Sequence, residues 1–149
     1  MVNNRDFREF IGLLNENGVK YLVIGGYAVA YHGYPRYTKD IDFWIWGDPE
    51  NARKITETIQ KFGFASLGIK VDDFLTPENV IQLGYPPARI DLLTALKDLN
   101  FETCYEKRVV EKFDDLEINF IDLESLIKSK LSAGRPQDKV DVQKLKDKQ

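Results

Sequence analysis

Cysteine and histidine are almost absent from this chain of 149 residues, which has one of each, Cys104 and His32. A single cysteine excludes an internal disulfide, and we therefore expect a reducing, cytoplasmic setting. A structural zinc site from this chain alone is not expected either, because such sites are held mainly by cysteine and histidine. We interpret Cys104 as a small packing residue. For His32, packing or capping at a helix end competes with a catalytic role.

Long apolar runs are also missing. No stretch approaches the roughly 20 residues that cross a bilayer. The first ten residues, MVNNRDFREF, lack the pattern of a signal peptide. Internal repeats and low-complexity linkers are missing as well. We therefore expect no membrane segment and a single domain over 1–149, with a core of sheet and helices over 1–121 and C-terminal helices over 122–149.

Charge of one sign does not dominate, since the formal net charge is −3. This balance argues against bulk binding of nucleic acid. The distribution is uneven, because residues 128–149 carry seven basic and three acidic side chains. Such a basic tail, beside an acidic metal site, could hold a polyphosphate or an RNA end. The alternative is an ordinary solvated helix face.

Apolar periodicity predicts alternating helices and strands. Helices are expected over 6–15, 26–33, 48–62, 122–133 and 136–146, and strands over 20–24, 40–46, 80–83, 89–93, 109–113 and 117–121. In the helix that begins at Asp122, Leu131 is expected on the inner face. This order predicts a mixed sheet with helices packed on it and a C-terminal helical pair, a two-layer α/β arrangement of the α+β class.

Two aspartates one residue apart, Asp40 and Asp42, follow the pair Gly25-Gly26 by about fourteen positions. Strand side chains at i and i+2 point the same way, so the two carboxylates share one face. Carboxylates this close repel each other unless a cation or proton lies between them. Magnesium is a hard cation that prefers oxygen ligands. We therefore expect a magnesium site here.

The glycines suggest a second part of the same site. Gly25 and Gly26 end an apolar strand and lead into a short helix. Without a Cβ, they let the backbone approach a ligand closely, and a helix N-terminus suits a phosphate. A phosphate cradle next to metal ligands suggests a nucleoside triphosphate bound with magnesium.

A third acid interrupts another apolar strand, at Asp91 in the segment RIDLL. A charge on a buried strand carries a desolvation cost that something must offset. If this strand lies beside the strand of Asp40 and Asp42, three carboxylates converge as in two-metal phosphoryl transfer. The alternative is a structural ion pair between Asp91 and Arg89 or another base.

Together these motifs resemble the polymerase-β-like nucleotidyltransferase superfamily, and most closely its minimal bacterial and archaeal members of the abortive-infection and toxin–antitoxin type. The signature is a hydrophobic residue, two small residues, a spacer, and acid–hydrophobic–acid. Here it is Ile24-Gly25-Gly26, then 27–39, then Asp40-Ile41-Asp42. Asp91 matches the third acid, and the ending KSKLSAGRPQDKVDVQKL is similar to the helical ending of the small members.

The resemblance implies transfer of a nucleoside monophosphate from a triphosphate, ATP first, to a hydroxyl, with release of pyrophosphate. Asp40, Asp42 and Asp91 would be catalytic and would bind two Mg²⁺ ions, with Mn²⁺ as a substitute. The nucleotide would be held by Gly25, Gly26, Arg36, Thr38, Lys39, Lys130 and Arg135. The acceptor stays open between a protein, a tRNA 3′ end and a small molecule, and a small helical toxin is a candidate partner. The competing hypothesis is a catalytically silent module of this fold that acts as an antitoxin or scaffold.

Overall fold

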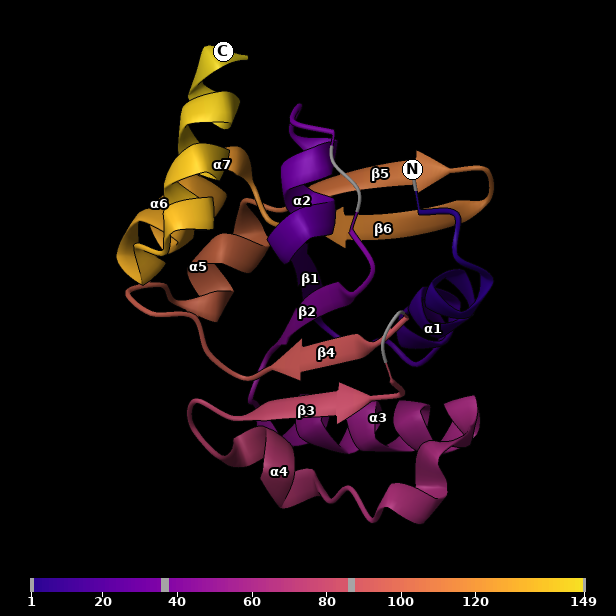
Figure 1. The fold of residues 1–149 in the computed structure, drawn as a ribbon. Coiled ribbons are helices and arrows are strands. Elements are labelled where there is room, and N and C mark those ends of the chain that lie inside the picture. The colour runs from indigo at the N-terminus through magenta and orange to yellow at the C-terminus, as the bar shows by residue number, and fades with distance from the viewer. Residues whose placement is uncertain (1, 36–37, 86–87, 149) are drawn as a thin grey trace.

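The computed structural model describes residues 2–35, 38–85 and 88–148. Its sheet has six strands in the order β3-β4-β2-β1-β6-β5 (Figure 1). The strands are β1 (Tyr21–Ile24), β2 (Ile41–Ile45), β3 (Val80–Leu83), β4 (Ile90–Leu93), β5 (Val109–Phe113) and β6 (Leu116–Phe120). The helices are α1 (Arg5–Glu16), α2 (Gly25–Tyr31), α3 (Pro49–Ile59), α4 (Val71–Leu75), α5 (Phe101–Glu106), α6 (Leu123–Ala133) and α7 (Pro136–Asp147), with a π-helical turn η1 (Gln60–Phe64) and a 3-10 turn η2 (Ala65–Leu67).

The sheet contains both parallel and antiparallel pairs. β1 is antiparallel to β2 and parallel to β6, while β2 is parallel to β4. The outer strands β3 and β5 are antiparallel to their neighbours β4 and β6. The mixed sheet and the α+β class expected from the sequence are therefore confirmed. The expected C-terminal helical pair is present as α6 and α7.

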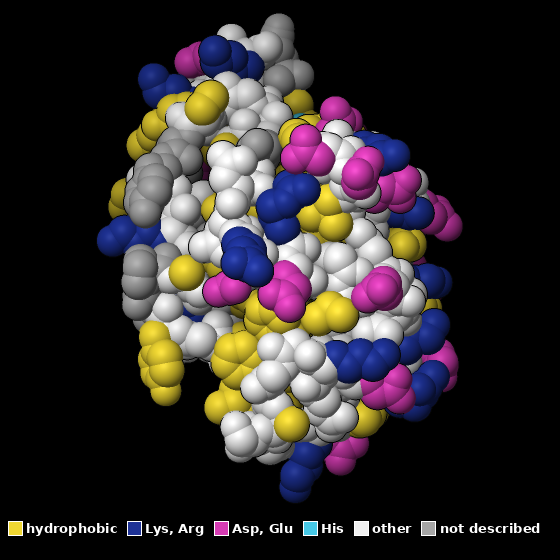
Figure 2. All heavy atoms as spheres, turned by 90° about the vertical axis from the view of Figure 1, so that its right-hand side faces the viewer, with side chains coloured by type: hydrophobic (Ala, Val, Ile, Leu, Met, Phe, Trp, Pro, Cys, Tyr) yellow, Lys and Arg dark blue, Asp and Glu magenta, His cyan; other side chains and the backbone are white. Residues whose placement is uncertain are grey.

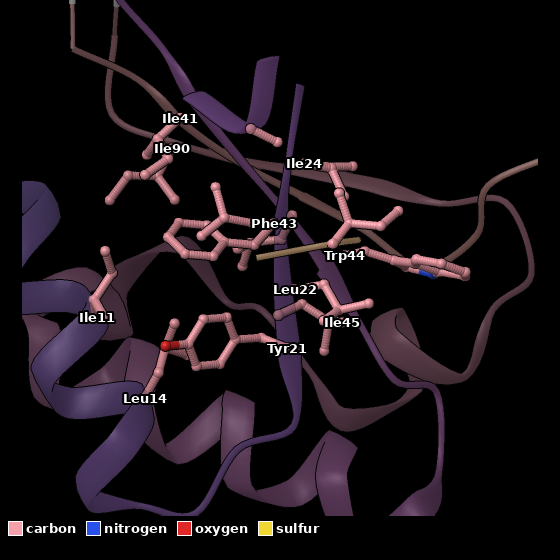
Figure 3. Close-up of a cluster of buried hydrophobic side chains, with 14 of the residues drawn as sticks. Ile11, Leu14, Tyr21, Leu22, Ile24, Ile41, Phe43, Trp44, Ile45 and Ile90 are labelled. Carbon is pink, nitrogen blue, oxygen red and sulfur yellow. The ribbon is translucent and has the colours of Figure 1, made fainter. Parts of the chain in front are cut away.

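The core lies against both faces of β2. Phe43 packs edge-on against Phe10 of α1, with ring centroids 5.5 Å apart. The next residue, Trp44, packs against Phe101 of α5 at 5.2 Å. Successive strand residues point to opposite faces, so α1 and α5 cover opposite sides of the sheet. Figure 3 shows the side that α1 covers, where Phe43 lies close to the buried ring of Tyr21.

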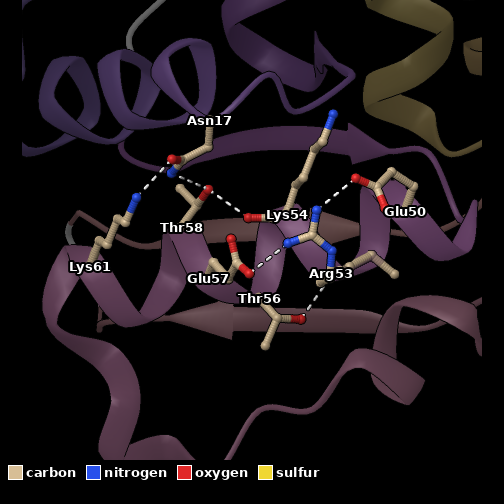
Figure 4. Close-up of polar contacts among 9 residues, drawn as sticks. Asn17, Glu50, Arg53, Lys54, Thr56, Glu57, Thr58 and Lys61 are labelled. Atoms are coloured by element: carbon tan, nitrogen blue, oxygen red, sulfur yellow. Dashed lines mark hydrogen bonds and ion pairs between the residues drawn. The ribbon is translucent and has the colours of Figure 1, made fainter.

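Helix α3 starts where the sequence predicts. The side chain of Asp48 accepts N–H groups of the first turn, and Pro49 takes the first helical position. On the exposed side, the guanidinium of Arg53 donates to acids of the neighbouring turns at 2.6 and 2.7 Å (Figure 4). Asn17 Nδ2 donates to Thr58 Oγ1 at 2.9 Å, which joins the end of α1 to α3.

Three local expectations were incomplete or wrong. The helix expected to reach Phe62 ends at Ile59 and continues as η1, which contains Gly63 at φ 107°. Helices α4 and α5 were not expected, and both are short. Leu131 was expected on the inner face of α6 but is 56% exposed. Lys130 is buried at this level instead, because it pairs with acids of α7.

The surface mixes charges of both signs. On the face drawn in Figure 2, the described acidic and basic side chains are interspersed. Phosphate backbones bind best to a continuous basic track, which this mixed face does not offer among the residues drawn in colour. None of the helices within 2–35, 38–85 and 88–148 combines the length and apolar character needed to cross a bilayer.

A buried asparagine connects the first turn of α3 to the residue before β1 and to the residue after β2. Asn51 Oδ1 accepts the N–H of Lys20 at 2.7 Å, and its Nδ2 donates to the carbonyls of Lys20 and Trp46 at 3.0 and 2.9 Å. We expect Asn51→Leu to lower the free energy of unfolding by about 2 kcal/mol, because three partly buried backbone groups lose their partners. Urea denaturation measures this. Glu57→Ala on the exposed side of the same helix is the control, and an equally small effect of both changes would contradict the assignment.

Candidate active site

The strand register places two acids side by side at the centre of the sheet. β2 and β4 run parallel, and Asp42 lies directly opposite Asp91 in this pair. Their side chains point to the same face, because paired residues of neighbouring strands do so. Asp91 is only 8% exposed. The two acids therefore share a confined space although they are far apart in sequence.

Asp42 lies in an unfavourable electrostatic position. Burial raises the pKa of Asp42 to about 7, and the negative charges of Asp91 and Asp40 add to this rise. The positive charge of Lys130 works in the opposite direction. Burial and the two neighbouring carboxylates outweigh the positive charge of Lys130 near Asp42. A bound cation would add positive charge and favour the ionised form of this carboxylate.

Arg89 ties the other two acids together. Its Nε and Nη2 donate to the two oxygens of Asp91 at 2.7 and 3.1 Å. Nη2 also lies 3.3 Å from Asp40 Oδ2, and the backbone N–H of Arg89 donates to Asp40 Oδ1 at 3.1 Å. These contacts, first the hydrogen bond to Asp91, raise the pKa of the Arg89 guanidinium. The ion pair between Arg89 and Asp91 is therefore present, and so is the close approach of Asp91 to Asp42.

Two features favour glycine at position 25: the backbone conformation there and the nearby carboxylate of Asp42. Its φ is +67°, a left-handed conformation that side chains rarely adopt. A Cβ on Gly25 would overlap Asp42 Oδ2, at a separation that real Cβ atoms do not show. The sequence suggested close approach of a phosphate as the reason for glycine. The structure adds a second reason, which is the carboxylate packed against this residue.

One polar cavity gathers most of the candidate residues. Its volume is about 520 Å³. It is lined by Gly25, Gly26, Thr38, Lys39, Asp40, Asp42, Asp91, Lys130 and Arg135, together with Arg89. The tenth candidate, Arg36, lies outside the described residues. Residues from the start of α2, from β2 and the segment before it, from β4 and from the α6–α7 region therefore meet around a single space.

A second, more apolar cavity of about 240 Å³ adjoins the first. The two share Gly25, Asp42, Lys130 and Arg135 as lining residues. The remaining wall of the second cavity includes the apolar side chains Leu93, Leu96, Ile121 and Leu126. A ligand could therefore place an apolar ring in one cavity and charged groups in the other, with Asp42 at the junction.

Lys130 and Arg135 contact acids of α7. The ammonium of Lys130 lies 3.3 Å from Asp138 Oδ1 and 3.0 Å from Asp141 Oδ2. Arg135 Nε donates to Asp138 Oδ2 at 2.7 Å. Burial acts to raise the pKa of Asp138, but the bonds from Arg135 and the charge of Lys130 hold it below its usual value. The Lys130 pairs fasten α7 to α6, whereas the Arg135 pair lies within the first turn of α7. Contact of Lys130 or Arg135 with a nucleotide stays a prediction.

Sequence reasoning missed the structural roles of three residues. Arg89 was considered only as a partner for Asp91, although its i, i+2 spacing already placed both on one strand face. Asp138 and Asp141 were counted only as part of a charged tail. Their i, i+3 spacing places them on one side of a helix, which was the available signal.

The donor chemistry of the site fits a divalent cation. Asp40, Asp42 and Asp91 offer carboxylate oxygens, which magnesium prefers. Within the described parts of the chain, no group of three or more acidic, histidine or cysteine side chains is already placed to hold a metal ion. Two of the acids are instead oriented towards Arg89. The buried charge of Asp42 is the feature that a cation would neutralise.

Comparison with solved structures shows the same fold in nucleotidyltransferases. TM1012 of Thermotoga maritima, a candidate nucleotidyltransferase, has a TM-score of 0.62 at 17% identity, over 97% of this chain and 92% of that one. The lincosamide antibiotic adenylyltransferase LnuA has a TM-score of 0.56 at 16% identity, over 97% of both chains. A nucleotidyltransferase-like antigenic protein of Paracoccidioides brasiliensis has a TM-score of 0.53 at 16% identity, over 93% of this chain and 71% of that one. At these identities the likeness establishes the fold alone.

Sequence comparison identifies the family. No curated protein matches the chain. The profile of a family described as "Nucleotidyltransferase of unknown function (DUF6036)" matches residues 6–146. This match includes the two glycines, the three acids and all but the last residue of the C-terminal helical pair. The chain therefore belongs to the DUF6036 family of nucleotidyltransferases.

Proposed function

We propose that this protein transfers a nucleoside monophosphate from a nucleoside triphosphate to a hydroxyl acceptor and releases pyrophosphate. The observation that carries the proposal is the pairing of Asp42 with Asp91 beside Gly25, inside one polar cavity. Membership of a nucleotidyltransferase family supports the reaction class. ATP is the first candidate donor, because the fold neighbour LnuA is an adenylyltransferase.

The chain's own residues have distinct roles in this reaction. Asp40, Asp42 and Asp91 would hold Mg²⁺ or Mn²⁺, which when bound would neutralise phosphate charge and activate the acceptor hydroxyl. The backbone at Gly25 and Gly26 would hold the β- and γ-phosphates, with Thr38, Lys39 and Arg135 in the same cavity. No protein nucleophile is needed, because positioning and charge stabilisation carry most of such transfers.

The second cavity would provide the other half of the substrate site. Leu93, Leu96 and Leu126 lie on its wall, and it opens next to Asp42. Its volume of about 240 Å³ suits a nucleobase or another single flat ring. A small molecule, a tRNA 3′ end or a protein side chain, including one on a small helical toxin, could then present its hydroxyl from the open polar side.

A labelling experiment tests the proposal. The protein is incubated with Mg²⁺ and ATP, CTP, GTP or UTP labelled at the α-phosphate, together with lysate, total tRNA or small hydroxyl compounds. We expect label from at least one nucleotide to be transferred to an acceptor, with pyrophosphate released in equal amount. Mg²⁺ and that nucleotide should also raise the melting temperature of the purified protein. Absence of both the transfer and the melting shift at millimolar nucleotide would reject the proposed enzyme.

A silent binding module remains the second candidate, because one observation favours it. Arg89 already neutralises Asp40 and Asp91, which is how a structural ion pair would treat these acids. Under this alternative, the protein would bind its partner without any nucleotide. Carboxylate-dependent binding of Mn²⁺ separates the two candidates, since a module that acts by contact alone does not need it.

A further inference from the structure

Arg89 occupies the position between two of the acids that the proposed function assigns to a metal. Its guanidinium contacts both oxygens of Asp91, at 2.7 and 3.1 Å, and Asp40 Oδ2 at 3.3 Å. Its backbone N–H takes the other oxygen of Asp40 at 3.1 Å. All four oxygens of these two carboxylates therefore accept contacts from one residue.

This arrangement suits the protein without metal. Three carboxylates that line one cavity repel one another, and a planar guanidinium that binds two oxygens at once is a strong counter-charge. A divalent cation at the same carboxylates would lie within a few ångströms of the guanidinium. Like charges at that distance repel strongly where water is partly excluded. Metal and guanidinium therefore compete for Asp40 and Asp91.

The side chain of Arg89 has room to move away from the two acids and into the polar cavity. Its side chain is 26% exposed, whereas that of Asp91 is 11% exposed. Arg89 lines the same polar cavity as Gly25, Gly26 and Lys39, where the triphosphate is proposed to lie. Phosphate oxygens match the guanidinium fork as well as carboxylates do.

We infer that Arg89 is an exchangeable counter-ion, which holds Asp40 and Asp91 in the metal-free protein, releases them when the metal binds, and then donates to the phosphate oxygens of the nucleotide. This inference rests on the proposed function, because it assumes that a metal and a triphosphate share this cavity. It assigns Arg89 a binding role that begins only after the metal has arrived. Metal and nucleotide binding are then coupled through one side chain.

Mn²⁺ binding without nucleotide tests the exchange, by isothermal titration calorimetry and by the EPR signal of free Mn²⁺. Wild type carries the cost of displacing Arg89, which lowers its apparent affinity. We expect Arg89→Gln to bind Mn²⁺ about tenfold more tightly than wild type, and to bind the Mn²⁺–nucleotide complex about tenfold more weakly. Arg89→Lys keeps the charge but lacks the planar fork of the guanidinium. Both of its affinities should lie between those of wild type and Arg89→Gln. The control Arg53→Gln removes two surface ion pairs on α3 and should change neither affinity.

Different failures have different meanings. Weaker Mn²⁺ binding by Arg89→Gln would show that Arg89 orients the acids for the metal, and would overturn the exchange. Unchanged Mn²⁺ affinity would reduce Arg89 to an ordinary ion pair and would also overturn it. If wild type binds no Mn²⁺, or binds it equally well after Asp42→Asn, the proposed function itself fails. The melting temperature of each metal-free variant confirms that it is folded.

Discussion

Replacing Asp42 with asparagine is expected to reduce nucleotidyl transfer by about 10²–10³-fold and yet to make the metal-free protein more stable at pH 8. Transfer falls because an amide oxygen binds a divalent cation far less well than a carboxylate. Stability rises because the variant no longer buries a negative charge beside Asp91. Activity and stability therefore change in opposite directions at one residue.

The direction of the pH effect follows from the pKa of Asp42, which is raised from 3.8 to about 7 by burial first and by Asp91 next. Between these two pH values the folded protein keeps a proton that the unfolded chain has lost. Its free energy of unfolding therefore falls as pH rises from about 4 to 7 and stays low above 7. Asp42→Asn should remove this fall, which corresponds to about 2–4 kcal/mol at pH 8.

Urea denaturation at pH 5 and pH 8 in the presence of EDTA measures the effect. Mg²⁺ should stabilise wild type at pH 8 but not the asparagine variant. Asp114→Asn is the control, because Asp114 is 89% exposed in the hairpin of β5 and β6. It should leave both transfer and the pH dependence unchanged. A variant at Asp42 that is less stable than wild type at pH 8, or that still transfers nucleotide at the wild-type rate, would contradict the assignment.

Adding one methyl group at Gly25 should be far more damaging than adding it at Gly68. The two glycines share almost the same backbone conformation, with φ of +67° and +68°. A Cβ on Gly68 meets open space, whereas a Cβ on Gly25 overlaps Asp42 Oδ2. The alanine at Gly68 therefore reports the left-handed backbone strain alone, about 1–2 kcal/mol. At Gly25 we expect a total loss of about 3–4 kcal/mol in the free energy of unfolding, because overpacking adds to that strain.

A double-mutant cycle locates the cause of the extra loss. Asp42→Ala removes the carboxylate that the new Cβ would meet, so Gly25→Ala should cost less in that background and approach the cost of Gly68→Ala. Gly25→Ala alone should also abolish Mn²⁺ binding, because the carboxylate of Asp42 must move to make room. Equal losses at Gly25 and Gly68 in the wild-type background would show that the carboxylate does not restrict this position.

Strong local patterns in the sequence predicted most of the strands and the longer helices. The limits of β3 and β5 were predicted to the residue, because turn residues follow both of these short segments. The cap at Asp48 and the proline after it predicted the start of α3. Helices α4 and α5 were missed, because five or six residues contain too few turns to show periodicity. Leu131 was placed inside because a hydrophobic pattern cannot reveal that α7 supplies partners for a buried lysine.

The amino-acid sequence by itself determined that Gly25-Gly26 follow a buried strand and that Asp40 and Asp42 lie two residues apart where the next strand begins, since these are properties of neighbouring residues. The sequence pointed to Asp91 as the third acid through a family resemblance, but tertiary structure decided where it lies, because the parallel pairing of β2 with β4 puts Asp91 opposite Asp42. It also decided that Arg89 bridges Asp40 and Asp91, and that Lys130 pairs with α7. Strand order and helix packing set these contacts, because they bring together side chains from separate strands and helices.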